Sequence, residues 1–110
     1  MNIIEHFVNG KKFSGDSKRK SKVYNPATGE HTAEVKLAST TDMNTTVEAA
    51  KTAFFSWSKK PPLQRARVMF KFKELIEKNS EMLTKIIVSE HGKVFDDAKG
   101  EVVRGLEVVE

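Results

Sequence analysis

The residues that could carry chemistry in this sequence are concentrated between Glu90 and Gly105, in the stretch EHGKVFDDAKGEVVRG. Its Gly92-Lys93 pair is also found in phosphate-binding P-loops, which need a glycine five residues earlier, a Ser or Thr after the lysine, and a preceding strand. Those two positions hold Ile87 and Val94, and a helical pattern comes before them. We therefore interpret Gly92 as a helix terminator that is followed by a surface lysine.

Arg104 and two nearby glycines form a second candidate. A glycine inside a helix costs about 0.5 to 1 kcal/mol relative to alanine, so Gly100 and Gly105 indicate close approach of another backbone or a ligand. Arg104 follows Gly100 by four residues and lies on nearly the same helix face. Its planar guanidinium can bind a carboxylate with two hydrogen bonds. The alternative is a surface ion pair with Glu101, Glu107 or another helix.

The remaining titratable residues do not suggest a catalytic or metal site. The three histidines, His6, His31 and His91, lie far apart and lack the spacing of metal ligands or of a catalytic triad. Asp96 and Asp97 are adjacent, so in a helix their side chains point about 100° apart and cannot act together on one substrate. Near the start of a helix they interact favourably with its dipole. The sequence contains no cysteine, which excludes disulfides, zinc thiolates and a thiol nucleophile within these residues.

Length and composition are those of one modest domain. The chain has 110 residues, of which 38% are hydrophobic and 31% are charged, and it contains no apolar run of membrane-spanning length. It has no targeting pattern at its start, so a cytoplasmic protein with no membrane partner is predicted. The net charge of +4 raises the hypothesis of a small basic nucleic-acid-binding protein, but only Lys18 to Lys22 are clustered. We expect no nucleic-acid partner, and a salt-dependent shift with DNA or RNA would test this.

The elements that must position these residues fall into two parts. Residues 1–38 predict a β-hairpin and strand arm, because Asn9-Gly10 favours a type I′ turn between two short apolar runs. In NPATGE, Pro26 and Gly29 favour a turn in which the glycine is left-handed. Residues 32–37 alternate between apolar and polar side chains, which is typical of a half-buried strand.

Residues 39–110 predict about four α-helices, which makes the content of the chain α+β. Ser39, Thr40, Thr41 and Asp42 are candidate N-caps for the first helix, and Pro61-Pro62 separates it from the second. Asn79 or Ser80 begins the third, and Gly92 ends it. Each helix carries an apolar stripe that predicts core packing. The stripe residues are Met43, Val47, Ala50, Phe54 and Trp57; Val68, Met69, Phe72, Leu75 and Ile76; Met82, Leu83, Ile86 and Ile87; and Phe95, Ala98, Val102, Leu106 and Val109.

The order of these motifs resembles the opening of an aldehyde dehydrogenase. VYNPATGE is followed by an alternating strand, the helix TTDMNTTVEAAKTAFFSWSK, then RARVMFKFKELIEKN and SEHGKVFDDAKGEV. RARVMFKFKELIEKN and AKGEVVRGLEVVE are similar to the CoA-acylating methylmalonate-semialdehyde dehydrogenase branch. The resemblance implies an α/β aldehyde dehydrogenase-like fold, of which residues 1–110 would be the N-terminal part of the NAD-binding domain. It also implies that Arg104 contacts the substrate carboxylate.

Members of that branch use NAD and CoA to convert malonate or methylmalonate semialdehyde to acetyl-CoA or propionyl-CoA, in valine and inositol catabolism. The resemblance implies that the catalytic cysteine and the dinucleotide-binding units lie outside these residues, so we expect neither activity nor cofactor binding from this chain alone. Its expected partner is the remainder of the dehydrogenase, in a homo-oligomer. The alternative is a free-standing interaction module that pairs with a separate dehydrogenase chain. Both hypotheses predict an exposed apolar patch along Leu106 and Val109, together with Phe95.

Overall fold

The computed structural model describes all 110 residues, which form two compact units. The strand unit comprises Met1–Tyr24 and Glu30–Lys59, and the helical unit comprises Asn25–Gly29 and Lys60–Glu110. The units therefore do not divide at residue 38, where the sequence changes from strand to helix patterning, because the first helix belongs with the strands. The predicted assignment of these residues to a NAD-binding domain stays a prediction.

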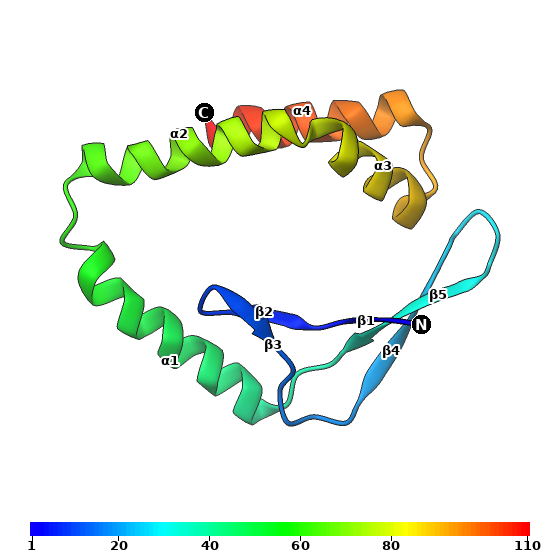
Figure 1. Cartoon of the computed structure of the whole chain (residues 1–110), viewed down its shortest axis with the longest axis horizontal. Helices are drawn as coiled ribbons and strands as arrows, with labels where there is room; N and C mark the ends of the chain where they lie inside the picture. Colours follow the sequence, from blue (N-terminus) through cyan, green and yellow to red (C-terminus); the bar gives the residue numbers. More distant parts are fainter. The chain divides into compact units, whose positions relative to one another are not determined.

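The strand unit contains a three-stranded sheet and a separate two-stranded hairpin (Figure 1). The sheet has the order β1-β5-β4, in which β1 runs parallel and β4 antiparallel to the central strand β5. Asn9 and Gly10 join the two hairpin strands, and their φ angles of 52° and 77° confirm the predicted turn with two left-handed residues. The strands are β1 (Asn2–Ile4), β2 (His6–Val8), β3 (Lys11–Phe13), β4 (Lys20–Tyr24) and β5 (His31–Lys36).

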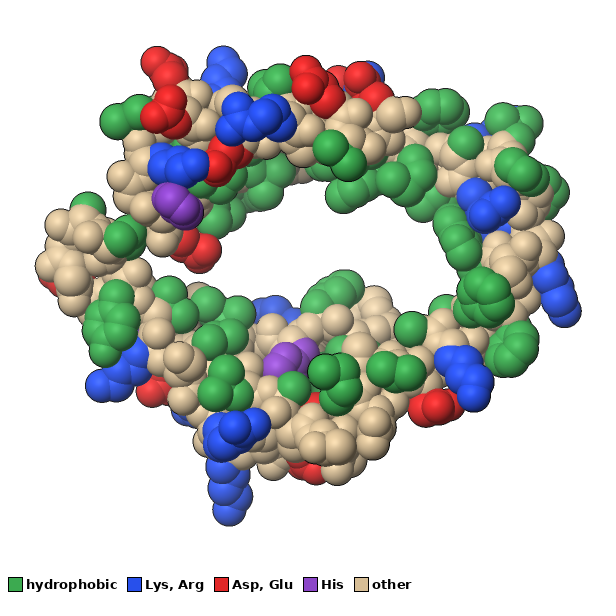
Figure 2. All heavy atoms as spheres, turned by 180° about the vertical axis from the view of Figure 1, so that it is seen from behind, with side chains coloured by type: hydrophobic (Ala, Val, Ile, Leu, Met, Phe, Trp, Pro, Cys, Tyr) green, Lys and Arg blue, Asp and Glu red, His purple; other side chains and the backbone are tan.

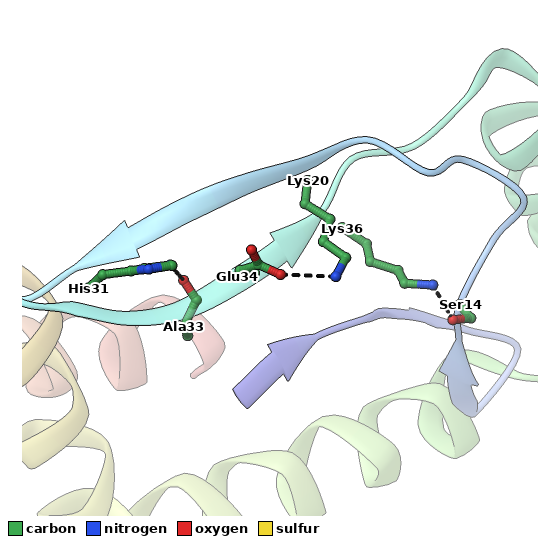
Figure 3. Close-up of polar contacts among 6 residues, drawn as sticks. All are labelled: Ser14, Lys20, His31, Ala33, Glu34 and Lys36. Carbon is green, nitrogen blue, oxygen red and sulfur yellow. Dashed lines mark hydrogen bonds and ion pairs between the residues drawn. The ribbon is translucent and has the colours of Figure 1, made fainter. Parts of the chain in front are cut away.

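Polar contacts fasten the central strand β5 to its surroundings (Figure 3). Lys20 Nζ on β4 lies 2.9 Å from Glu34 Oε2, and the hydrogen bond from Lys20 lowers the pKa of Glu34. Lys36 Nζ donates to the hydroxyl of Ser14, beyond the end of β3. His31 Nε2 lies 2.9 Å from the carbonyl oxygen of Ala33, the one apolar side chain buried in this unit. Lys20, part of the basic cluster, is thus engaged within the unit.

The N-terminus of α1 (Thr40–Trp57) is closed by a capping box, which confirms Ser39 as its N-cap. Ser39 Oγ accepts from the backbone N–H of Asp42, and Asp42 Oδ2 accepts from the backbone N–H of Ser39 at 2.9 Å. Asp42 Oδ1 also accepts from the backbone N–H of Asp16 at 2.9 Å, so this side chain ties the helix to the loop after β3. Asp42 is only 3% exposed. Its carboxylate is therefore a structural acceptor and not an available catalytic group.

Acidification is expected to weaken the strand unit through Asp42. The hydrogen bond from the Ser39 backbone, supported by those from Asp16 and Ser17, holds the pKa of this carboxyl below its usual value. A depressed folded pKa stabilises the fold fully above the unfolded pKa of about 3.9, and that stabilisation is lost as pH falls through the folded pKa. The fluorescence of Trp57, the only tryptophan, can follow unfolding between about pH 6 and about pH 2. The free energy of unfolding of Asp42→Asn should fall less steeply with decreasing pH than that of wild type. Equal slopes for the two proteins would contradict the stabilising role of the Asp42 carboxylate.

The helical unit consists of α2 (Pro62–Lys78), α3 (Ser80–His91) and α4 (Phe95–Val109) (Figure 1). Pro62 is the first residue of α2, at the helix break that Pro61-Pro62 predicts. Asn79 alone separates α2 from α3, and its side-chain amide donates to the carbonyl of Leu75 at 2.7 Å. Gly92 ends α3 with φ 76°, which confirms the predicted left-handed terminator. A Cβ at Gly92 would lie 3.2 Å from Cγ of Pro26, so the turn at residues 25–29 packs closely there.

The predicted burial of the helical stripes is wrong for most of their residues. Ala33 and Ala98 are the only buried hydrophobic residues, whereas Phe54 is 62% exposed and Phe72 is 49% exposed. Hydrophobic side chains are accordingly visible on the surface of both units (Figure 2). The periodicity was correct, but the other elements of the same unit cover these faces only in part. The exposed stripe residues are Met43, Val47, Ala50, Phe54, Trp57, Val68, Met69, Phe72, Leu75, Met82, Ile86 and Phe95.

No helix in the chain combines the length and the apolar content needed to cross a bilayer.

Candidate functional site

Arg104 lies on α4 with an exposed side chain that makes no hydrogen bond or salt bridge. Its guanidinium folds back along the helix toward Gly100, where a Cβ would lie 3.3 Å from Arg104 Nη1. The predicted sharing of a helix face by Arg104 and Gly100 is thus confirmed. The proposed surface ion pairs with Glu101 and Glu107 are not formed. Arg104 therefore presents free hydrogen-bond donors at the surface of the helical unit.

Glu101 is held by another cation. Lys93, in the short connection between α3 and α4, donates to Glu101 Oε1, and the two side chains are 31% and 32% exposed. This hydrogen bond is the main cause that lowers the pKa of the Glu101 carboxyl, and the charges of His91 and Arg104 lower it further. Sequence reasoning missed this pair because Lys93 lies outside α4, eight positions before Glu101, where helix spacing predicts no contact. Only the direction of the chain after Gly92 brings them together.

Gly105 serves a different surface from Gly100. It lines an apolar groove between the three helices of the helical unit, and a Cβ at this position would meet nothing within 4 Å. Arg104 does not line this groove, because adjacent helical residues point about 100° apart. Thus only Gly100 of the two glycines belongs to the surroundings of Arg104. The groove is lined by Phe72, Ile76, Leu83, Ile86, Ile87, Val102, Gly105 and Val109.

The predicted patch at Leu106, Val109 and Phe95 is divided by the fold. Val109 is half-buried and lines the apolar groove, and Leu106 is also half-buried. Phe95 is 43% exposed but borders a polar hollow formed with Glu77, Lys78, Ser80, Glu81, Thr84 and Lys99. The exposed apolar surface near Val109 therefore lies where α2 and α3 meet α4. It does not extend to Phe95.

The other titratable candidates are not assembled into a centre. No group of three His, Asp or Glu residues is placed to hold a metal ion. Asp96 and Asp97 lie in the first turn of α4, as predicted from the helix dipole. His91 lies in the last turn of α3, where a cation is favourable, and His31 contacts a backbone carbonyl. His6 Nε2 is buried without a hydrogen-bond partner.

The residues present do not form a site for a dinucleotide cofactor. Such a site uses a glycine-rich turn from a strand into the N-terminus of a helix, where backbone N–H groups meet the pyrophosphate. The connection from β5 to α1 contains no glycine, and its helix N-terminus is already occupied by the carboxylate of Asp42. The first turn of α4 carries Asp96 and Asp97, which would repel a phosphate. These residues therefore offer no glycine-rich phosphate site of this kind.

Comparison with known sequences identifies the relatives of this arrangement. Residues 13–110 match the model of the aldehyde dehydrogenase family. The chain is 41% identical over 110 residues to a malonate-semialdehyde dehydrogenase of Pseudomonas aeruginosa, covering 100% of this chain and 22% of that protein. It is 44% identical over 108 residues to malonate-semialdehyde dehydrogenase 2 of Bacillus cereus, covering 98% of this chain and again 22% of the relative. It thus spans less than a quarter of the length of these curated relatives.

Solved structures agree with the sequence relatives. A methylmalonate-semialdehyde dehydrogenase of Oceanimonas doudoroffii superposes with a TM-score of 0.95 at 45% identity, over 99% of this chain and 22% of that one. A protein of Sinorhizobium meliloti 1021, provisionally described with the same activity and complexed with NAD, gives a TM-score of 0.96 at 47% identity. It is covered to the same extent, 99% of this chain and 22% of that chain. The chain therefore has the α/β aldehyde dehydrogenase-like fold over this segment, with α+β content.

Proposed function

This chain belongs to the aldehyde dehydrogenase family, and from that membership we propose that it supplies the N-terminal part of a methylmalonate- or malonate-semialdehyde dehydrogenase. The observation that carries the proposal is similarity along nearly the whole chain to proteins of that activity, at 41% and 44% identity. We propose that the complete enzyme uses NAD, belongs to the CoA-acylating branch, and acts as a homo-oligomer in the cytoplasm. Its products would be propionyl-CoA or acetyl-CoA, formed in valine and inositol catabolism.

What this chain would contribute to such an enzyme follows from the catalytic groups that it lacks. Aldehyde oxidation through a covalent thioester needs a cysteine nucleophile, and these residues contain none. Bound NAD would supply the hydride acceptor, and residues outside this chain must hold it. The chain by itself is accordingly proposed to be inactive. Its contribution would be to hold the carboxylate of the semialdehyde and to cover the rest of the fold with its exposed helical faces.

Arg104 is the residue proposed to hold that carboxylate. Its guanidinium is exposed and unpaired, and the absence of a side chain at Gly100 leaves room beside Nη1. A guanidinium matches the planar geometry of a carboxylate and can donate two parallel hydrogen bonds to it. A semialdehyde with one carboxylate and one aldehyde would then be oriented by its charged end, which places the aldehyde away from α4.

The proposal is tested by joining these residues to the remainder of a methylmalonate-semialdehyde dehydrogenase and comparing the joined protein with the isolated chain. We expect the joined protein to form NADH and an acyl-CoA when given malonate semialdehyde, NAD and CoA. The isolated 110-residue chain should form no NADH above a blank. NADH production by the isolated chain would refute its inactivity, and a free acid as product in place of an acyl-CoA would refute the acylating branch.

A second function is favoured by the exposed stripes of α1 and α2. Large apolar faces without a cover are typical of surfaces that bind another polypeptide. The chain would then be a free-standing interaction module that binds a separate dehydrogenase chain. The reading frame after Glu110 distinguishes the two functions: a continuing frame that encodes a cysteine nucleophile supports the first. A stop codon beside a partner gene supports the second.

A further inference from the structure

Arg104 is unpaired although acidic residues flank it on its own helix. Glu101 precedes it by three residues and Glu107 follows it by three, and both spacings bring side chains together on a helix. Residues at these spacings have Cβ atoms about 5–6 Å apart, which is within reach of a Glu–Arg ion pair. Glu107 is exposed and forms no salt bridge, and Glu101 pairs with Lys93 and not with Arg104. Something must therefore account for the partner that Glu101 takes.

Lys93 is the residue that takes Glu101 as its partner. Gly92 ends α3 in a left-handed conformation, and the extended backbone of Val94 leads into α4, so that Lys93 lies beside the second turn of that helix, where Glu101 is. Its ammonium donates to Oε1 of Glu101 in a pair that is about two-thirds buried on both sides. An ion pair that is partly removed from water is screened less than an exposed one. Lys93 therefore competes for Glu101 more effectively than the exposed side chain of Arg104 does.

Gly100 makes the second contribution to the same arrangement. The terminal nitrogen Nη1 of Arg104 lies only 3.3 Å from the position that a Cβ would take at Gly100. Without that Cβ, the guanidinium lies along the helix one turn before its own Cα, where it stays exposed. Arg104 is thus close to Glu101 in the sequence, but its guanidinium is not bound to the Glu101 carboxylate.

We propose that Lys93 is a positioning residue for Arg104: by holding Glu101, it prevents the guanidinium from pairing within its own helix and keeps it free for an external carboxylate. The identity of that carboxylate, the charged end of a semialdehyde, rests on the proposed function. The competition of Lys93 and Arg104 for Glu101 does not rest on it. The two parts can therefore be tested separately.

The competition is tested on the 110-residue chain by NMR of the Arg104 side chain. In Lys93→Met, we expect Glu101 to pair with Arg104, which shifts the Arg104 Nε–Hε resonance and slows exchange of its proton with water. In the double variant Lys93→Met/Glu101→Gln, the resonance should return to its wild-type position. Lys99→Met is the matched control, because it removes the same charge from α4 at an exposed site without an ion pair. An unchanged Arg104 resonance in Lys93→Met would overturn the proposal.

The consequence for binding is tested in the joined enzyme by steady-state kinetics. A helix ion pair of ordinary strength would occupy Arg104 enough to raise the KM for malonate semialdehyde by about 2- to 5-fold in Lys93→Met. The KM for propanal, an aldehyde without a carboxylate, should not change. The double variant should recover the wild-type KM for the semialdehyde. If the ion pair were merely structural, the double variant would be no better than Lys93→Met, and that result would also overturn the proposal.

Failure of the proposed function gives a different pattern. If Arg104→Met left the ratio of the two KM values unchanged, Arg104 would not bind the substrate carboxylate, whatever the NMR experiment found at Lys93. Where Lys93→Met impairs folding, which helical circular dichroism would reveal, Lys93→Arg tests the same idea, because arginine retains the charge. That variant should keep both the Arg104 resonance and the KM within about 2-fold of wild type.

Discussion

Replacing Arg104 with methionine is expected to raise the KM for malonate semialdehyde by about 10- to 100-fold in the joined enzyme. The estimate corresponds to loss of charged hydrogen bonds that contribute about 1.5 to 3 kcal/mol, where 1.4 kcal/mol is a factor of ten. The side chain is exposed and forms no hydrogen bond or salt bridge within the helical unit, so the melting temperature should remain near that of wild type. Steady-state kinetics with the semialdehyde and with propanal measure the effect.

The controls for this prediction separate charge from geometry. Arg104→Lys keeps the charge but cannot donate two parallel hydrogen bonds, so it should recover only part of the loss. Glu107→Gln removes an unpaired charge on the same helix and should leave both KM values near wild type. An equal rise in the KM for propanal would show that Arg104→Met disturbs the fold or the binding of aldehydes in general, and the proposed contact with the carboxylate would be wrong.

Replacing Gly15 with alanine is expected to destabilise the strand unit by about 2 to 5 kcal/mol. Gly15 has φ +68°, where a side chain costs about 1 to 2 kcal/mol, and overpacking adds about 1 to 3 kcal/mol. Its Cβ would lie 2.6 Å from Oδ2 of Asp42. This carboxylate cannot move aside without losing the hydrogen bonds from Ser39 and Asp16 that hold it. The free energy of unfolding can be measured from denaturant titration with Trp57 fluorescence.

Gly10→Ala is the matched control for this substitution. Gly10 also has a positive φ, +77°, but a Cβ there would meet nothing within 4 Å. Only the conformational cost of about 1 to 2 kcal/mol should then appear. Equal effects at Gly10 and Gly15 would mean that the clash with Asp42 relaxes freely, contrary to the rigidity that its hydrogen bonds imply. An alanine at Gly15 that costs less than one at Gly10 would contradict the prediction outright.

Local signals were sufficient to predict most of the elements. Asn9-Gly10, Ser39, Pro62 and Gly92 each act through their own backbone conformation or through neighbours within a few residues. The structure has a turn, an N-cap, a helix start and a helix end at these four positions. Interactions of this range involve residues that are close in the sequence, so they can be predicted without knowledge of the tertiary packing.

Contacts between distant residues could not be read in the same way. Asp42 was predicted only as one of several candidate caps, but the loop at Asp16, 26 residues earlier, makes it a buried acceptor. The pairing of Lys93 with Glu101 likewise depends on the extended backbone of Val94 in the connection between α3 and α4. Periodicity showed which helical faces are apolar, but whether those faces are covered depends on other elements. A pattern along one helix contains no information about the surface opposite it.

The sequence by itself determined the hairpin, the strand near residues 32–37, the order of the four helices, and Arg104 as a candidate carboxylate-binding residue, because local geometry and residue type are sufficient for these. It did not predict β1 or β4. Only the tertiary structure decided that Arg104 is unpaired, that Glu101 belongs to Lys93, and that Gly105 faces an apolar groove and not the arginine. The physical reason is that an ion pair forms with whichever charge the fold brings nearest and shields from water. Oppositely charged neighbours on a helix are only candidate partners, and the packing of the rest of the unit determines which of them form an ion pair.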